Sequence, residues 1–190
     1  MPKSAPQIET SRLILRGHVI DDFNTIADLW ADPEMVRFIG GVPSSREASW
    51  TRLLRYVGHW QLMGFGYWVI IHKDSGQFVG EIGFADFQRE MQPSMDNKAE
   101  MGWVLSPKFH GKGYASEAAM AVLDWADTHI PLQVCCIINP ENGPSIRLAE
   151  KNGFTLQAET SYQGAKVRLF TRPVVVKLTA NIADGENRLC

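Results

Sequence analysis

Cysteine is scarce in this sequence, with three residues among 190. Cys135 and Cys136 are neighbours in an apolar run, and Cys190 is the last residue. Neighbouring side chains of a strand point to opposite faces, so the adjacent pair is a poor disulfide or metal site. We predict that both are buried small hydrophobic residues. This sparing use of cysteine is typical of a reducing compartment, and it predicts a cytoplasmic protein.

An excess of one charge and long hydrophobic runs are also lacking. The net charge is −2, with no run of lysine or arginine, which argues against binding to nucleic acids or to a membrane surface. No apolar stretch approaches the roughly 18 residues of a membrane span. Met1 to Ser4 lack the apolar segment that a signal peptide needs. The histidines are scattered without the spacing of metal ligands, so no metal is predicted.

The pattern of apolar and turn residues predicts one domain over residues 1–180, followed by a frayed polar tail over 181–190. Antiparallel strands come first and a strand-helix-strand-helix segment follows, which indicates a mixed sheet with helices on its faces. We expect strands at 12–16, 66–71, 78–87, 99–105, 132–138, 154–159 and 166–178, and helices at 21–30, 44–63, 115–129 and 144–151.

Two local features of the early helices are predicted as well. Asp21 and Asp22 are expected to cap the first helix. The second helix has apolar residues at helical spacing, which predicts one buried stripe made of Trp50, Leu53, Leu54, Val57 and Trp60.

The most informative segment is a glycine-rich turn between a strand and a helix, His110-Gly111-Lys112-Gly113-Tyr114-Ala115. A helix N-terminus offers unpaired backbone N–H groups and a partial positive charge, which suit a phosphate. Glycines let the backbone approach an anion without a Cβ in the way. The segment therefore predicts a pyrophosphate site, and its structural alternative is a plain turn that joins a strand to a helix.

Two well-known phosphate-binding patterns fit this turn poorly. The dinucleotide fingerprint needs a third glycine, but Ser116 stands three residues after Gly113. The nucleoside-triphosphate loop needs a Ser or Thr directly after its lysine, and none follows Lys112.

Four blocks of the sequence resemble the GNAT superfamily of acyl-CoA-dependent N-acyltransferases, and most of all its RimJ/RimL-like branch. The last two blocks, at their correct separation, are specific, whereas the first two only support the resemblance. The blocks cover residues 8–16, 76–84, 99–118 and 139–154. The resemblance implies an α/β (α+β) fold, with a mixed and mostly antiparallel central sheet of about seven strands and about four helices on its faces.

The resemblance also implies acetyl-CoA as co-substrate, bound in a split between two parallel strands. The pantetheine would add beside the strand much as a peptide does, and backbone donors near its end would form an oxyanion hole. The implied binding residues are Trp103, Val104, Leu105, His110, Gly111, Lys112, Gly113, Tyr114, Ala115, Asn142 and Ser145. His110 stands where the family motif has Gln or Arg, so one side chain that helps to hold phosphate is missing.

Acetyl transfer to an amine needs a base, because only a neutral amine attacks a thioester. Glu100 is the first candidate, since a carboxylate on this strand often serves in the family; alternatively it is a solvated charge or a partner for Lys98 or Arg89. Glu81 is the second candidate. Ala149 replaces the family's usual tyrosine acid, and the branch implies Ser145 as its substitute, although a serine there is also a good helix cap.

We therefore expect an acetyl-CoA-dependent N-acetyltransferase that acts on a primary amine, either a protein N-terminus or a small amine, by direct attack in a ternary complex. A non-catalytic acyl-CoA-binding module is the alternative, and an ATP-binding domain is a more remote one. The family layout puts Trp60, Gly64, Phe65 and Tyr67 near the acceptor. A homodimer through the exposed hairpin or the terminal strand stays open.

Overall fold

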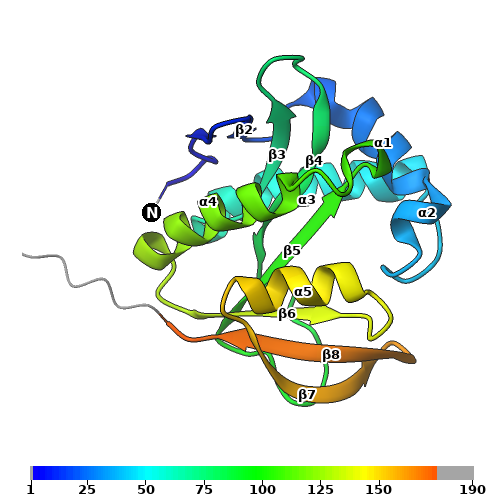
Figure 1. Ribbon diagram of the computed structural model, residues 1–190, viewed down its shortest axis with the longest axis vertical. Helices are drawn as coiled ribbons and strands as arrows, with labels where there is room; N and C mark the ends of the chain where they lie inside the picture. Colours follow the sequence, from blue (N-terminus) through cyan, green and yellow to red (C-terminus); the bar gives the residue numbers. More distant parts are fainter. Residues whose placement is uncertain (1, 175–190) are drawn as a thin grey trace, which may run out of the picture.

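The computed structural model describes residues 2–174 and contains one eight-stranded sheet (Figure 1). Neighbouring strands follow the order β1-β2-β3-β4-β5-β6-β8-β7, and every neighbouring pair is antiparallel except β5 and β6. The predicted mixed sheet is confirmed, with eight strands instead of about seven. The strands are β1 Ile8–Glu9, β2 Leu13–Arg16, β3 Tyr67–His72, β4 Phe78–Ala85, β5 Lys98–Leu105, β6 Gln133–Ile138, β7 Thr155–Tyr162 and β8 Ala165–Arg172.

Helices cover both faces of this sheet. Figure 1 shows α4 and α5 on the near side and α3 behind the strands. The helices are α1 Phe23–Ala31, α2 Pro33–Val36, α3 Arg46–Met63, α4 Tyr114–His129 and α5 Gly143–Lys151, with 3-10 turns at Ile20–Asp22 and Pro107–Phe109. Among residues 2–174, no helix is both long and apolar enough to cross a lipid bilayer.

The parallel pair β5 and β6 stays together over only three positions. Lys98 to Glu100 lie opposite Gln133 to Cys135, and no pairing continues beyond them. Each strand then follows its other neighbour: β5 stays paired with β4 as far as Leu105, and β6 stays paired with β8 as far as Ile138. The sheet therefore splits between Met101 and Leu105, and one edge of β5 is left without a strand partner there.

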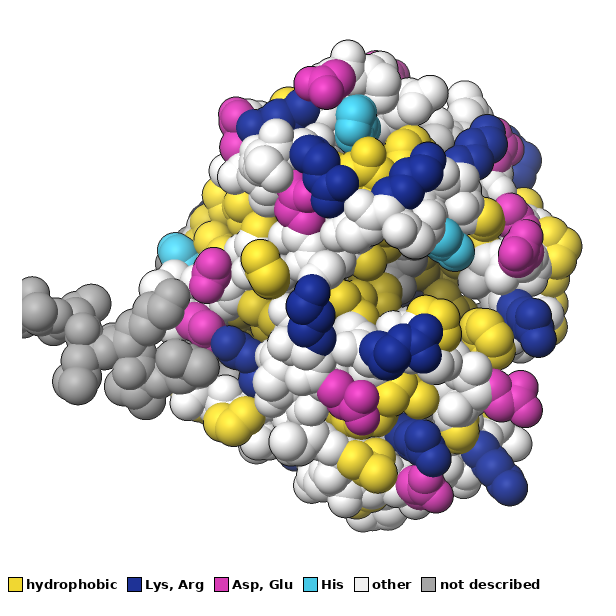
Figure 2. All heavy atoms as spheres, viewed as in Figure 1, with side chains coloured by type: hydrophobic (Ala, Val, Ile, Leu, Met, Phe, Trp, Pro, Cys, Tyr) yellow, Lys and Arg dark blue, Asp and Glu magenta, His cyan; other side chains and the backbone are white. Residues whose placement is uncertain are grey.

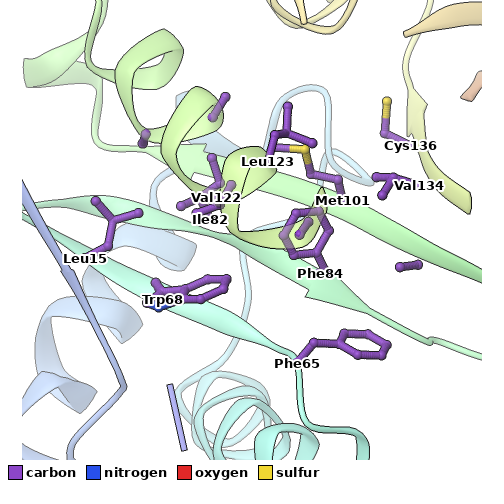
Figure 3. Packing of buried hydrophobic residues seen from close by; sticks show 14 of the residues in the cluster. Leu15, Phe65, Trp68, Ile82, Phe84, Met101, Val122, Leu123, Val134 and Cys136 are labelled. Atoms are coloured by element: carbon purple, nitrogen blue, oxygen red, sulfur yellow. The ribbon is translucent and has the colours of Figure 1, made fainter. Parts of the chain in front are cut away.

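The main hydrophobic core packs α4 against the sheet (Figure 3). Trp68, Ile82 and Phe84 come from the central strands, and Val122 and Leu123 come from α4. Each of these side chains is buried, and burial of a side chain of this size stabilises the fold by about 1.5–3 kcal/mol. A second core lies on the opposite face, where α1, α2 and α3 cover the sheet.

The apolar stripe predicted for the helix at 44–63, which is α3, is wrong for three of its five residues. Leu53 and Trp60 are buried, but Trp50, Leu54 and Val57 are exposed by 37%, 53% and 49%. The buried side of α3 also contains Ser49 and Tyr56. The helix is rotated relative to the expectation because packing on the sheet selects Tyr56, which stacks on Tyr67, and not the most hydrophobic face.

The predicted aspartate cap of the first helix is also wrong. Asp22 occupies the position before α1, but its side chain accepts no capping hydrogen bond from that helix. Its two oxygens are held by the Arg16 guanidinium at 2.7 Å each, and one also accepts from the Val19 N–H. A bidentate pair between two charged groups is stronger than a hydrogen bond from one backbone N–H, so the carboxylate binds Arg16.

The cysteine prediction is confirmed for the pair in the sheet. Cys135 and Cys136 are buried free thiols on opposite faces of β6, in two different hydrophobic clusters. Burial raises the pKa of Cys135 to about 12, so its thiol is unreactive at neutral pH. The predicted frayed tail over 181–190, like Cys190, lies outside the described residues.

We predict that Gly80→Ala destabilises the sheet beside the split. A Cβ at this position would lie 2.1 Å from the Val104 carbonyl oxygen and 2.8 Å from the Leu105 Cα, so β5 would have to move. The free energy of unfolding in urea should fall by about 2 kcal/mol or more. Gly58→Ala is the control, because its Cβ meets no atom within 4 Å and a helical alanine stabilises by up to about 1 kcal/mol. Equal stability of Gly80→Ala and the wild type would contradict this packing.

Candidate active site

The glycine turn begins where β5 ends, and it leads directly into α4. Gly111 and Gly113 have φ angles of 72° and 81°, in the left-handed region that favours glycine, and Gly113 is the N-cap of α4. Within the described residues, the backbone N–H groups of Gly111 and Lys112 donate to no backbone carbonyl. The first-turn N–H groups of α4, from Tyr114 onward, have no intrahelical acceptor. The turn therefore presents a series of free donors toward the end of the split.

His110 takes part in the turn differently from the other residues. Its backbone N–H donates to the Pro107 carbonyl at 3.1 Å. Its ring Nε2 lies 2.9 Å from the Leu105 carbonyl oxygen, which ties the turn to the end of β5. The free backbone donors thus begin at Gly111, and His110 positions the turn.

An ion pair that the sequence did not reveal holds this turn from the other side. The Arg12 guanidinium donates to the Glu117 carboxylate at 2.7 Å and to the Lys112 carbonyl at 3.0 Å, and it lies over the Tyr114 ring. Glu117 also accepts from the Thr10 hydroxyl and from the Arg12 backbone N–H. Burial alone would raise the pKa of Glu117, but these hydrogen bonds outweigh it and lower the pKa to about 2.

A hollow lies between α4 and α5, on the side where the split opens (Figure 2). Its floor is hydrophobic, and lysine and arginine side chains lie around its rim. Trp103 spans the split, because its indole N–H donates to the Ser145 hydroxyl of α5 at 3.2 Å. Asn142 caps α5 by accepting from the Ser145 N–H at 3.2 Å.

Glu100 lies at the base of the split, and its side chain points to the α3 face of the sheet. It forms a bidentate pair with Arg89, with distances of 2.5 and 2.8 Å. Burial raises the pKa of Glu100 above its ordinary value, although the charge and hydrogen bonds of Arg89 oppose this. A small depression, lined among others by Asp86, Lys98 and Arg89, opens beside the carboxylate.

Glu81 occupies a different environment on the same face. It is 0% exposed, and its two oxygens lie 2.7 Å from the His18 Nε2 and 2.8 Å from the Trp30 indole nitrogen. Both oxygens of this carboxylate are therefore held by side chains that are themselves buried. Such a fully satisfied buried carboxylate is suited to fixing α1 on the sheet.

Comparison with known proteins decides the family. Residues 12–155 match the family described as the acetyltransferase (GNAT) domain. The chain belongs to the GNAT acetyltransferases. It is 30% identical over 165 residues to the N-acetyltransferase p20 of Bacillus licheniformis, itself uncharacterized, covering 84% of this chain and 89% of that protein.

Solved structures of GNAT acetyltransferases have the same fold. An acetyltransferase from Agrobacterium tumefaciens is 28% identical, with a TM-score of 0.77 over 90% of this chain and 95% of the other. The RimL ribosomal L7/L12 α-N-protein acetyltransferase, solved with coenzyme A, shares the fold at 17% identity, with a TM-score of 0.73 over 90% and 99%. These matches agree with the predicted RimJ/RimL-like architecture, and this GNAT protein is an acyltransferase.

In this GNAT protein, most of the predicted site residues lie along the split between β5 and β6, and the others lie elsewhere. Trp103, Ser145 and Asn142 meet across the split, and the glycine turn lies at its open end. Glu81 is enclosed elsewhere, and Trp60 and Phe65 belong to the main core. Arg12 was missed as a site residue; the signal was its presence in the first resembling block together with Glu117 in the third.

We predict that Glu117→Gln loosens the N-terminal segment from the turn. After allowance for solvent screening, the lost charged hydrogen bonds should lower stability by about 1 kcal/mol at pH 7, or about 2–4 °C in melting temperature. Because the pKa of Glu117 falls from 4.5 to about 2 on folding, its contribution is present above pH 4.5 and is lost as the pH falls through about 2. The gap between the two melting curves should therefore narrow over that range.

Glu159→Gln is the matched control for this ion pair. Glu159 pairs with Arg168 across β7 and β8, but its side chain is 63% exposed, so its removal should change the melting temperature little. A gap between wild type and Glu117→Gln that is the same at pH 7 and near pH 2 would contradict the assignment.

Proposed function

We propose that this protein transfers the acetyl group of acetyl-CoA to a primary amine by direct attack in a ternary complex. The observation that carries the proposal is the split between β5 and β6, which ends at a turn of free backbone donors. A strand edge with unpaired amides suits the pantetheine arm, which has amides of its own. A helix N-terminus with glycines suits the pyrophosphate.

The cofactor-binding residues divide into three groups in this proposal. Backbone N–H groups of Gly111, Lys112, Gly113, Tyr114 and Ala115 hold the pyrophosphate, and His110 holds the turn in place through the Leu105 carbonyl. The edge of β5 at Trp103, Val104 and Leu105 pairs with the pantetheine. Asn142 keeps its amide N–H₂ available on the other side of the split, because its side-chain oxygen caps α5.

We assign the base to Glu100 and not to Glu81. Burial raises the pKa of Glu100, which makes its carboxylate a better proton acceptor, and the depression beside it offers an approach for the amine. Glu100 is also held through both oxygens, by Arg89, but it borders this depression, whereas Glu81 is 0% exposed and enclosed by His18 and Trp30.

We assign to Ser145 the relay of a proton from solvent to the leaving thiolate. Its hydroxyl oxygen accepts from the Trp103 indole, so the hydroxyl proton stays available for donation. The pKa of a thiol is about 8.5, so this help is modest, and solvent can replace it.

The arginines near Glu100 restrict the class of amine that can be the acceptor. Arg89 neutralises the carboxylate, and Arg55 adds a second positive charge that acts on it. These two positive charges would repel a polycationic acceptor. We therefore expect an α-amine, as on the protein acted on by RimL, to be a better acceptor than a polyamine such as the spermine bound to the Vibrio cholerae spermidine N-acetyltransferase.

The first experiment is calorimetric titration with acetyl-CoA, CoA and ATP, followed by a panel of α-amine peptides, small amines and spermidine. Micromolar binding of acetyl-CoA, none of ATP, and turnover with an amine are the expected results. Binding without turnover on the whole panel would favour a non-catalytic acyl-CoA-binding module. No binding of acetyl-CoA would overturn the proposal.

For the turn, we predict that Gly113→Ala weakens acetyl-CoA binding by about tenfold or more. A left-handed alanine costs roughly 1–2 kcal/mol, and relief of that strain would turn the N–H donors away from the phosphates. Gly164→Ala is the matched control, because it imposes the same strain at φ 80° in the β7–β8 hairpin. Calorimetry should give a normal dissociation constant for this control. A normal constant for Gly113→Ala would remove the turn from the binding site.

For the base, we predict that Glu100→Gln lowers kcat by about 10²–10⁴-fold while acetyl-CoA binds normally. In the wild type, kcat/KM should fall as the pH drops through a pKa above the ordinary glutamate range, because the protonated carboxyl accepts no proton. The variant should lack that acidic limb. Glu159→Gln should keep the wild-type profile. Wild-type turnover by Glu100→Gln would exclude Glu100 as the base.

A further inference from the structure

The hydroxyl group of Tyr67 lies over the freed edge of β5. A Cβ built on Gly102 would be 2.1 Å from the Tyr67 Oη, so the hydroxyl occupies the place of the missing side chain. Gly102 lies two residues beyond Glu100, the last position of β5 that pairs with β6. The phenol oxygen is therefore at the start of the split, on the same face of the sheet as the Glu100 carboxylate.

Two glycines in register make room for this tyrosine. Tyr67 lies opposite Gly83 of β4, and Gly83 lies opposite Gly102 of β5. A Cβ at Gly83 would be 2.4 Å from the Tyr67 Cα, which shows how closely the two strands approach. The side chain crosses β4 over the first glycine and ends over the second. Its ring is fixed from above by stacking on Tyr56, with centroids 4.4 Å apart and planes 8° from parallel.

Among residues 2–174, no hydrogen bond joins the Tyr67 hydroxyl to another group, and the oxygen is not one of the fully buried polar atoms that lack a partner, so it keeps access to solvent although the residue is only 6% exposed. Its stacking partner differs, because the Arg55 guanidinium lies 5.6 Å from the centroid of the Tyr56 ring. A free and accessible donor beside the split can take a partner that arrives with the substrates.

The protonation state of this tyrosine is fixed by its surroundings. Burial, followed by the neighbouring Tyr56 and Glu100, raises the pKa of Tyr67 well above its ordinary value. The phenol therefore stays neutral during the reaction. Transfer of its proton to a thiolate, whose conjugate acid has a pKa of about 8.5, would be unfavourable, so it acts as a hydrogen-bond donor.

We propose that Tyr67 is a catalytic residue whose hydroxyl donates a hydrogen bond to the acyl oxygen at the Gly102 edge of β5. This inference rests on the proposed acetyl transfer. When the amine attacks, the new C–N bond forms and negative charge collects on that oxygen. The charge then returns as the C–S bond breaks, the amine proton goes to Glu100, and the sulfur takes a proton from solvent, either directly or through the Ser145 hydroxyl, which receives a proton from water as it gives up its own. Tyr67 keeps its own proton throughout.

Tyr67→Phe tests this role, because it removes one oxygen and keeps the stacked ring. We expect kcat to fall by about 10²-fold, as for the loss of one oxyanion donor, while the calorimetric dissociation constant of acetyl-CoA and the melting temperature stay near wild type. Tyr56→Phe is the matched control, since it removes the other hydroxyl of the same stack. Its kcat should stay within about twofold of wild type.

Gly102→Ala provides a second test that keeps the tyrosine. Its Cβ displaces the hydroxyl, so kcat should fall by a similar factor. If both variants act through the same hydrogen bond, the double variant should be little worse than either single one, because their effects are not additive. Additive losses would indicate two separate packing effects and would overturn the proposal.

The outcomes separate this inference from the function on which it rests. A wild type that transfers no acetyl group overturns both. A wild type with turnover that Tyr67→Phe retains in full overturns only the role of Tyr67. Equal losses in Tyr67→Phe and Tyr56→Phe would assign the effect to packing of the stack and also overturn it. If the melting temperature of Tyr67→Phe is much lower than that of the wild type, Gly102→Ala replaces it as the test. A fall in kcat with normal acetyl-CoA binding in Gly102→Ala supports the role of the Tyr67 hydroxyl, and wild-type kcat overturns it.

Discussion

The short parallel pairing of β5 with β6 is the constraint on which the rest of this structure depends. Three paired positions hold the two halves of the sheet together, and beyond Glu100 each strand follows a different neighbour. Backbone amides on the inner edge of β5 stay free because β6 is committed to β8. An open edge of this kind is usually a liability in a β-protein. Here it is enclosed by α4 and α5, so the edge is protected and still accessible to a ligand.

The split also separates two chemical environments. On the side of α4 and α5, the hollow has a hydrophobic floor, a basic rim and the glycine turn at its end. On the side of α3, the same strand presents Glu100 with its partner Arg89, and the Tyr67 hydroxyl lies nearby. In the proposed reaction, the two substrates therefore approach the same stretch of β5 from opposite faces. This arrangement fits direct transfer, because no covalent intermediate on the protein is needed to connect them.

The sequence predicted those parts of the structure that rest on local signals. The glycine turn and the order of strands and helices follow from nearby residues. The rotation of α3 was not predictable, because it depends on Tyr56 meeting Tyr67 from another element. The same holds for Arg12 and Glu117, which lie 105 positions apart, and for the glycines in register beneath Tyr67. Each of these features exists only after distant strands have been aligned.

Trp103 is an intrinsic fluorescence probe of the split between β5 and β6. Its indole N–H bridges the split to Ser145, and its side chain is partly exposed, whereas Trp30, Trp60 and Trp68 are buried in the cores. Indole emission responds to the polarity and hydrogen bonding around the ring. Any molecule that enters between β5 and α5 must pass beside this indole and compete for the same hydroxyl. Occupancy of the cleft can thus be followed by the protein's own fluorescence, without a label and before any acceptor has been identified.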